Sequence, residues 1–479
     1  MTQQPRVRFA PSPTGYLHVG GLRTALYNYL FARRLGGTVI LRIEDTDRSR
    51  FVEGAAENLA STLAWAGLHF DEGPGIGGDF GPYIQSQRSD IYTAHAHQLL
   101  EEGKAYRCFC TSEELEASRQ KQIAEKRDPA YDRRCRALTP EEVQKRIEEG
   151  MPFTIRMKVP VVGQMHFHDL VRGEITVHFD AIDDQVLIKS DGFPTYHLAN
   201  VVDDHLMGIT HVIRGEEWLP SAPKHQLLYD FLGWEAPAFA HLPLLLNEDR
   251  TKLSKRQGDV AVEDYRNKGF LPTALVNFVA LLGWNPGDDR EMFTLAELEQ
   301  AFSLERVSKA GAVFDIEKLR WFNAQYLRAL PPAELAGHCG PWMRAAGFDT
   351  GDNTRTEAVV AAFASYLTLP SDIAAHLPFL TIAQVTLENA EDRLLLAGED
   401  AQSVLKRFAD LAETQAPWDA ETVKALIKQV QADTGIKGKG LFMPLRLALT
   451  AEQHGPDLGM MAELLGRDTC VRRVRAQIT

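Results

Sequence analysis

The first 44 residues form a strand–helix–strand pattern, and this pattern constrains the fold more than any other feature of the chain. Residues 6–10 have the composition of a strand, and apolar residues recur at helical spacing over 22–35. Gly36 and Gly37 end that helix, and the β-branched stretch 38–43 follows as a second strand. A unit of this length implies a parallel sheet with ligands beyond the carboxyl ends of its strands. We therefore expect an α/β fold with a site at that edge.

A long irregular stretch then interrupts this rhythm. Residues 105–187 carry two close cysteines, a basic helical segment and alternating strands. We interpret them as an α+β insertion between two halves of the sheet, 1–104 and 188–250. The stretches 186–190 and 211–214 are expected to be strands of that sheet resuming after the insertion.

Helical periodicity dominates from about residue 272 onward, broken by glycines and prolines. We expect residues 326–479 to be all-α and residues 1–325 to form a Rossmann-like α/β domain, of which 251–325 is the last part. The chain is thus predicted to be multidomain, which its 479 residues allow.

Composition narrows the class of protein. With 44% hydrophobic and 24% charged residues, the chain is globular. The N-terminus has no signal-peptide pattern, and the longest apolar runs, such as 242–246, are too short to cross a membrane. Five cysteines make an odd, sparse set, which indicates reduced thiols in a cytoplasmic protein rather than a disulfide framework.

The charge distribution bears on possible partners. A net charge of −13 taken alone argues weakly against nucleic-acid binding. However, residues 119–136 hold seven Lys/Arg, and the C-terminus carries Arg467, Arg472, Arg473 and Arg475. Basic islands on an acidic body suit a selective polyanion partner that must also dissociate. Each island alone is equally well explained as a solvated helix face.

The turn between the first strand and the helix, residues 11–21, is the first candidate site. Backbone N–H groups and the helix dipole favour phosphate there. Gly20 and Gly21 remove Cβ atoms where a base or ribose could approach the backbone. His18 can donate hydrogen bonds to phosphate oxygens whose charge grows in a transition state. The alternative is a glycine-containing turn with a capping histidine, because short glycine motifs are weak signals.

The second strand ends in acidic residues. Glu44, Asp45 and Asp47 would lie at the carboxyl edge of the sheet, where carboxylates could hold an ammonium group or Mg²⁺. Turn and helix-cap chemistry is the alternative, and we prefer it for Asp45 and Asp47, which are good N-caps. Glu44 is the functional candidate.

A basic loop at 250–256 is the second candidate site. It places four cations within seven residues, Lys252 and Lys255 among them. Two lysines on such a loop can close over a triphosphate and neutralise charge at the reacting phosphorus. In isolation, a solvated basic loop is the simpler interpretation. The coincidence with the turn at 11–21 favours the functional one.

These two motifs resemble the signatures of class I aminoacyl-tRNA synthetases. His18-Val19-Gly20-Gly21 looks like their HIGH motif, and Lys252-Leu253-Ser254-Lys255-Arg256 looks like their KMSKS loop. The strings at 8–15, 41–47, 189–205 and 213–218 resemble the glutamyl/glutaminyl branch. The string at 438–446 resembles the helical anticodon-binding domain of bacterial glutamyl-tRNA synthetases. The resemblance runs through nearly the whole chain.

The resemblance implies a division of labour between the predicted domains. Residues 1–325 would be catalytic, with 105–187 as an acceptor-stem insertion and 251–325 as a stem-contact region. Residues 326–479 would bind the anticodon.

The resemblance also implies a glutamate site and an ATP site. The fork of arginine matches a carboxylate, so Arg8 and Arg214 would face the carboxylates of glutamate, and Glu44 its ammonium group. The remaining glutamate-site residues would be Ala10, Ser12, Tyr196 and Asn200. The implied ATP-site residues are His18, Gly20, Gly21, Glu217, Trp218, Leu245, Lys252, Leu253 and Lys255. Without the resemblance, Tyr196 and Trp218 would be interpreted as core aromatics and Asn200 as a surface amide.

The implied activity is that of a glutamate–tRNA ligase. Glutamate would react with ATP and Mg²⁺ to form glutamyl-adenylate, and the glutamyl group would pass to the 3′-terminal adenosine of tRNA(Glu). His18, Lys252 and Lys255 would supply charge stabilisation. The resemblance further implies activation only in the presence of tRNA, and a monomer. The alternatives are a glutaminyl-tRNA synthetase, expected to carry a β-barrel anticodon region, and a non-catalytic RNA-binding relative, against which the intact motif residues argue.

The cysteine cluster departs from the family pattern. Cys108, Cys110 and Cys135 look like part of a zinc site found in some bacterial glutamyl enzymes, which has a fourth ligand two residues after the third cysteine. Here that residue is Ala137, and a structural zinc needs four ligands. His166 or His168 could substitute, but nothing in the sequence indicates it. We therefore expect no zinc at these cysteines and interpret them as reduced thiols in a packed hairpin.

Overall fold

A computed structural model describes residues 4–47, 52–253, 260–382 and 384–479. The chain divides into two compact units. Unit 1 comprises Met1–Tyr265 and Leu275–Ile316, and unit 2 comprises Arg266–Ala274 and Glu317–Thr479.

A six-stranded sheet forms the centre of unit 1, in the order β2-β1-β8-β9-β5-β6. Its first four strands and β5 run parallel, and β6 pairs antiparallel to β5. The strand bounds are β1 Arg6–Phe9, β2 Thr38–Leu41, β5 Gln164–Asp169, β6 Gly173–His178, β8 His211–Gly215 and β9 Ala238–Leu242.

The strand–helix–strand prediction for the N-terminus is confirmed. Strands β1 and β2 pair in parallel from Arg6 opposite Thr38 to Phe9 opposite Leu41. Helix α1, Val19–Arg34, connects them and buries ten of its sixteen residues. The left-handed Gly36, with φ +65°, ends the helix as expected. The next turn at 36–37 returns the chain to β2, so the loop after β1 lies at the carboxyl edge of the sheet.

A separate three-stranded antiparallel sheet, β3-β4-β7, lies in the insertion. Its strands are β3 Ala105–Cys108, β4 Thr154–Met157 and β7 Val186–Ile188. The expectation that 186–190 would resume the parallel sheet is therefore wrong. The position beside β9 is taken by β5 through the pair Asp169 and Phe239, and Leu187 of β7 packs in a core with Ile155 and Met157 of β4.

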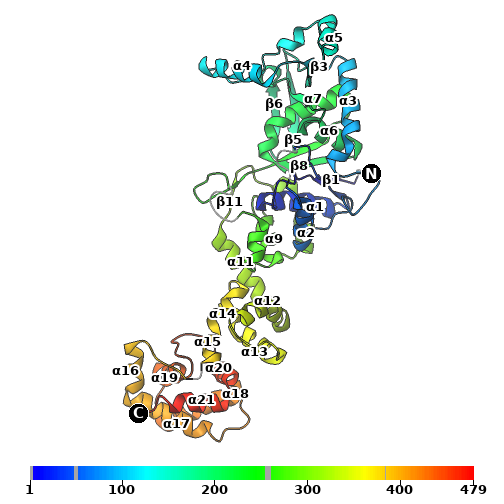
Figure 1. Ribbon diagram of the computed structural model, residues 1–479. Helices are drawn as coiled ribbons and strands as arrows, with labels where there is room; N and C mark the ends of the chain where they lie inside the picture. The colour runs from blue at the N-terminus through cyan, green and yellow to red at the C-terminus, as the bar shows by residue number, and fades with distance from the viewer. Residues whose placement is uncertain (1–3, 48–51, 254–259, 383) are drawn as a thin grey trace. The chain divides into compact units, whose positions relative to one another are not determined.

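The remaining elements of unit 1 surround these sheets. Figure 1 shows β3, α4 and α5 of the insertion gathered at one end of this unit. The helices are α2 Ala55–Trp65, α3 Ser89–Glu101, α4 Ser112–Ala124, α5 Pro140–Glu148, α6 Tyr196–Leu206, α7 Ala222–Leu232, α8 Val262–Asn267, α9 Pro272–Ala280 and α10 Leu295–Ala301. The end of α8 and the start of α9, within Arg266–Ala274, belong to unit 2. Two short strands, β10 Leu245–Leu246 and β11 Ala312–Val313, pair in parallel.

Unit 2 contains helices and no strand in its described residues, as the periodicity predicts. The helices are α11 Ile316–Ala329, α12 Pro332–Ala345, α13 Asn353–Phe363, α14 Ile373–His376, α15 Pro378–Thr381, α16 Ala390–Ala397, α17 Glu399–Ala412, α18 Ala420–Thr434, α19 Lys439–Thr450, α20 Leu458–Leu465 and α21 Arg467–Arg475. Apolar faces of α17 to α21 share one core that includes Phe408, Val423, Leu441 and Cys470.

Within the described ranges, no single helix has both the length and the apolar composition needed to span a bilayer; one sharply bent pair, Asn353–Tyr366 with Pro370–His376, meets the criterion only when joined.

Candidate active site

Two adjoining cavities open at the carboxyl edge of the parallel sheet in unit 1. The larger, of about 920 Å³, is lined by the ends of β1 and β8, the loop after β1 and the start of α6. The smaller, of about 360 Å³, shares His18, Gly20, Gly21 and Glu217 with it and adds Leu245, Lys252 and Leu253. Every described residue of the predicted glutamate and ATP sites lines one or both cavities. Lys255 lies outside the described residues.

His18 is held at the N-terminus of α1. Its Nδ1 accepts a hydrogen bond from the backbone N–H of Gly20 at 2.9 Å, which places the ring proton on Nε2. The capping role considered from the sequence and a role toward phosphate are therefore compatible. A Cβ at residue 20 would lie 3.3 Å from this Nδ1, whereas one at residue 21 would lie 2.9 Å from Leu17. Packing against Leu17 accounts for the glycine at 21.

The chain around the basic loop meets the start of α1. The backbone N–H of Val19 donates to the carbonyl of Val260 at 2.8 Å. On the other side of the loop, Leu253 donates to the carbonyl of Leu245 at 2.9 Å. The exposed Lys252 consequently lines the same cavity as His18, so two segments far apart in the sequence border one space.

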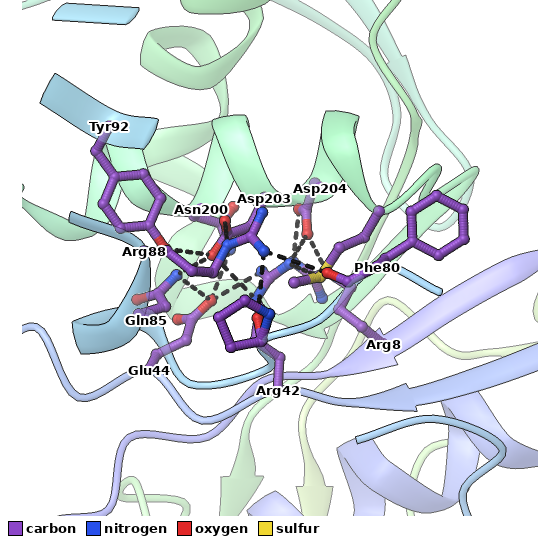
Figure 2. Close-up of polar contacts among 12 residues, drawn as sticks. Arg8, Arg42, Glu44, Phe80, Gln85, Arg88, Tyr92, Asn200, Asp203 and Asp204 are labelled. Atoms are coloured by element: carbon purple, nitrogen blue, oxygen red, sulfur yellow. Dashed lines mark hydrogen bonds and ion pairs between the residues drawn. The ribbon is translucent and has the colours of Figure 1, made fainter. Parts of the chain in front are cut away.

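Below the larger cavity lies a buried network of charged residues (Figure 2). Arg8 forms a two-point contact with Asp204 at 3.0 and 3.1 Å. Arg42 lies between Glu44 at 2.9 Å and Asp204 at 2.8 Å. Beyond them, Arg88 bonds Asp203 at 2.7 Å. The three guanidinium groups are thus matched by three carboxylates.

The pKa values of this network agree with ion pairing. Burial raises the pKa of Asp204, but Arg8 and Arg42 outweigh it, so the carboxyl stays ionised with a pKa below its usual value. Burial opposes the charge of Arg42, yet Asp204, Glu44 and Asp203 raise its pKa well above the usual value. Arg8 already has an anionic partner in Asp204, so its charge is largely satisfied without a ligand.

Glu44 faces both this network and the cavity. Its Oε1 accepts from Arg42 and, at 3.1 Å, from Asn200 Nδ2. Among the described residues, no partner is found for Oε2, and the residue lines the larger cavity while only 4% exposed. Burial raises the pKa of Glu44, opposed by Arg42 and Arg8. An added cation at Oε2 would favour the ionised carboxylate.

Arg214 has only neutral direct partners. It donates to His241 Nε2 at 3.0 Å, to Tyr196 Oη at 3.1 Å and to His225 Nδ1 at 3.1 Å, with a longer contact of 3.5 Å to the carbonyl of Trp218. No carboxylate of the described residues lies within ion-pair distance of it. Arg214 is 5% exposed and lines the larger cavity. A buried guanidinium without an anion in contact is costly, so this position is suited to an anionic ligand.

Aromatic and acidic groups border the rest of the cavities. The rings of Tyr196 and Trp218 lie 4.2 Å apart, and Trp218 is 38% exposed, so it is not the core residue considered from the sequence. Burial raises the pKa of Tyr196, which keeps its hydroxyl protonated. Glu217 and Asp47 line the larger cavity, so the turn interpretation preferred for Asp47 does not account for its position. Asp45 lies outside the lining and accepts from the backbone N–H of Ser86 at 2.8 Å, in line with the turn role preferred for it.

Sequence reasoning missed Arg42, Asp203 and Asp204. Arg42 lies two residues before Glu44 in extended chain and therefore projects to the same side. Asp203 and Asp204 lie three and four residues after Asn200 on α6 and share its face. These spacings from Glu44 and Asn200 were the sequence features from which the three residues could have been predicted.

Three cysteines of the insertion form a cluster away from the cavities. The sulfur atoms of Cys108, Cys110 and Cys135 all lie within 4.8 Å of one another. Tyr131 Oη lies 3.2 Å from Cys108 Sγ and 3.7 Å from Cys110 Sγ. Tyr131 Oη is thus a fourth potential metal ligand beside the three sulfur atoms. The family spacing, which expects the fourth ligand at position 137, does not include it.

Comparison with known proteins decides the family. Residues 4–321 match the family model for class I tRNA synthetases (E and Q), catalytic domain. The chain belongs to this family. Residues 334–478 of the synthetase match the model of an anticodon binding domain.

The relatives of this synthetase extend over its whole length. It is 48% identical to the glutamate–tRNA ligase of Clostridioides difficile strain 630 and 47% identical to that of Alkaliphilus metalliredigens strain QYMF, with 98% of both chains covered in each case. Among solved structures, it is similar to a glutamate tRNA ligase from Elizabethkingia meningosepticum in complex with its amino acid. That match has a TM-score of 0.92 and 38% identity and covers 99% of both chains.

Proposed function

We propose that this chain is a glutamate–tRNA ligase, which uses ATP to form glutamyl-adenylate and transfers the glutamyl group to tRNA(Glu) with release of AMP and pyrophosphate. The observation that carries the proposal is the contrast between Arg8, which is paired with Asp204, and Arg214, whose direct partners are neutral. Glutamate has one carboxylate more than it has ammonium groups, and Arg214 accommodates it. Glutamine lacks that second anion and would leave Arg214 without one.

In the proposed complex, the amino acid lies between Glu44 and Arg214. Glu44 takes the ammonium group through Oε2, and Arg214 takes the side-chain carboxylate through its Nη2 side. Tyr196 and Ser12 add hydrogen bonds, and Ala10 lines the wall. Asn200, which bonds Glu44 at 3.1 Å, orients that carboxylate. Arg8 supports the site by fixing Asp204. It also lines the larger cavity, where its positive charge would face the carboxylates of glutamate.

ATP is proposed to occupy the smaller cavity and the region shared with the larger one. The Nε2–H of His18 and the ammonium groups of Lys252 and Lys255 would stabilise charge that develops on the phosphates. Gly20 and Gly21 line both cavities, and Gly20 would admit the nucleotide close to the start of α1. Glu217, Trp218, Leu245 and Leu253 would border the ribose and adenine. Mg²⁺ would bind with the phosphates of ATP, since it usually keeps several waters and few protein ligands.

The reaction needs no covalent intermediate with the protein. A carboxylate oxygen of glutamate forms the new bond to the α-phosphorus, and the bond to pyrophosphate breaks. A ribose hydroxyl of the terminal adenosine then attacks the mixed anhydride, and AMP leaves. The residues described above bind, orient and neutralise charge, so most of the acceleration would come from positioning and electrostatics.

The domain roles form part of the proposal. Residues 1–325 would be catalytic, 105–187 would hold the acceptor stem, 251–325 would contact the stem, and 326–479 would bind the anticodon. The family matches at 4–321 and 334–478 support a boundary near 325. We propose that the protein is a monomer, because both cavities are formed by residues of a single chain. We propose a cytoplasmic location, because that is where charged tRNA is used.

The test is ATP–pyrophosphate exchange with purified protein. We expect exchange with glutamate in the presence of tRNA(Glu) and none when tRNA is left out. Exchange with glutamine in place of glutamate would indicate a glutaminyl enzyme, and no exchange with either amino acid would indicate a non-catalytic relative. Both outcomes would overturn the proposal.

A further inference from the structure

Arg214 is held by a row of side chains across three neighbouring strands. Arg214 of β8 and His241 of β9 are partners in the parallel register, and Asp169 ends β5, which pairs with β9. His241 and Asp169 are 0% exposed, and neither lines the cavities. Their contact with the cavity therefore runs through Arg214.

The donor-only guanidinium fixes the tautomer of His241. Because arginine cannot accept a hydrogen bond, His241 Nε2 must present a lone pair to Arg214 Nε at 3.0 Å. The ring proton is then on Nδ1 and is donated to Asp169 Oδ2 at 2.6 Å. Burial lowers the pKa of His241 although Asp169 opposes it, so the ring is neutral. A carboxylate that fixes the proton on Nδ1 makes Nε2 a better acceptor.

The same reasoning orders the other side of Arg214. His225 Nδ1 must accept from Arg214, so its Nε2–H donates to His197 Nδ1 at 3.1 Å. Burial, reinforced by Arg214, lowers the pKa of His225 well below its usual value. Burial and then Lys224 lower the pKa of His197 to about 3. Neutral rings on both sides leave the charge of Arg214 available to a ligand.

Asp169 belongs to the insertion and is fixed by its own turn. Its Oδ1 accepts from the backbone N–H groups of Val171 at 3.0 Å, Arg172 at 2.8 Å and His241 at 3.3 Å. Burial raises the pKa of Asp169, but the hydrogen bonds from His241 and from the backbone outweigh it, and the pKa lies below its usual value. The side chain of Arg172 also bonds the carbonyl of His241 and pairs with Glu216. This turn of the insertion is thus anchored to β9.

We propose that Asp169 is a positioning residue for amino-acid recognition: acting through His241, it holds Arg214 in the orientation that binds the substrate carboxylate. The inference rests on the proposed function. It makes a residue of the insertion, the region assigned to the acceptor stem, responsible for affinity at the glutamate site.

Asp169→Asn separates this role from a structural one. The amide oxygen can still accept from the three backbone N–H groups, so the turn is kept. The amide NH₂ then faces His241 Nδ1 and favours the tautomer with its proton on Nε2, which places two donors opposite each other at Arg214. We expect the KM for glutamate to rise about 10- to 100-fold, the range for loss of a hydrogen bond to a charged group. The KM values for ATP and tRNA should stay close to those of the wild type. The Tm should fall modestly, because two buried donors then face each other at Arg214.

A second pair of variants tests the acceptor itself. His241→Gln offers an amide oxygen to Arg214 without help from Asp169, whereas His241→Leu offers none. We expect the KM for glutamate to rise at least tenfold more in His241→Leu than in His241→Gln. We also expect Asp169→Asn to have less than about a threefold effect on KM when His241→Gln is present. The comparison of His241→Leu with His241→Gln holds even where Asp169→Asn alone fails to fold.

Asp184→Asn is the matched control, because Asp184 is another fully buried carboxylate of the insertion, paired with Arg133 and Arg136. Its glutamate KM should be unchanged. An equal KM for glutamate in His241→Leu and His241→Gln would overturn the inference. So would an Asp169→Asn effect on this KM that is the same in the wild-type protein and in the His241→Gln variant. Wild-type protein that fails to charge tRNA with glutamate would instead overturn the proposed function, so the two failures are distinguishable.

Discussion

Replacing Arg214 by lysine keeps one positive charge in the cavity but removes the geometry that makes the charge useful. Arg214 uses its Nε–H and both hydrogens of Nη1 on His241, Tyr196 and His225, which leaves Nη2 with only the 3.5 Å contact to Trp218. One guanidinium thus holds three neutral acceptors and still presents a donor to a ligand. A lysine ammonium has three donors on a single atom and cannot reach the same acceptors and a carboxylate together.

The size of the effect follows from these contacts. Loss of a charge-assisted hydrogen bond to the substrate carboxylate costs about 1.5–3 kcal/mol, which corresponds to a roughly 10- to 100-fold rise in the KM for glutamate. The buried ring nitrogens of His241 and His225 would also lose their donor, at about 1–3 kcal/mol each. The Arg214→Lys protein should therefore be less stable as well as weaker in binding. Its KM for ATP should change little, since the nucleotide is assigned to the neighbouring cavity.

The assay is steady-state charging of tRNA(Glu) with glutamate varied, together with a thermal unfolding measurement. Arg88→Lys is the matched control, because Arg88 is a buried guanidinium paired with Asp203 at 2.7 Å and lines neither cavity. It should lower the Tm without raising the KM for glutamate. A folded Arg214→Lys protein with a wild-type KM, or equal KM changes in both variants, would refute the assignment of Arg214.

Two further predictions concern pH and metal. Burial lowers the pKa values of His197, His225 and His241. As the pH falls below about 6.5, the usual pKa of histidine, each takes up a proton more readily in the unfolded chain than in the folded one, so stability should fall with acid. Each contributes up to about 1.4 kcal/mol of loss at pH 5.5, so scanning calorimetry at pH 7.5 and 5.5 should show a lower Tm at pH 5.5, and an unchanged or higher Tm would contradict it. The sequence predicts no bound zinc at the three cysteines, which elemental analysis of protein purified without chelators checks. About one zinc per chain would contradict the prediction, and loss of that zinc in Tyr131→Phe would identify Tyr131 as a ligand.

Local pattern was sufficient to predict the start of the fold and the two segments that border the smaller cavity. The helix of α1 and its flanking strands follow from spacing and from Gly36, and the residues near 18 and 252 do border one cavity. Strand β7 shows the limit. Its three apolar residues favour an extended segment but do not determine which strand it pairs with. The position beside β9 is occupied by β5, and β7 pairs with β4 instead.

The residues around the cavities that the sequence did not indicate lie outside the lining and contact the residues that line them, directly or through one other side chain. Asp169 and His241 are 72 residues apart and become neighbours only because β5 joins the sheet beside β9. A fixed spacing after Cys135 points to Ala137 and does not include Tyr131, which lies four residues before Cys135. Contacts of this kind depend on tertiary packing, and a single sequence carries no local mark of them.

The hairpin formed by β5 and β6 makes the insertion inseparable from the catalytic core. Cutting out residues 105–187 would strip two strands from the sheet and leave β9 with an unpaired edge. Chimaeras that exchange this region between relatives should therefore retain Gln164–His178 of the host. Exchange of the insertion without Gln164–His178 would leave the six-stranded sheet intact, whereas exchange of all of 105–187 would also replace Asp169, the residue proposed to position Arg214.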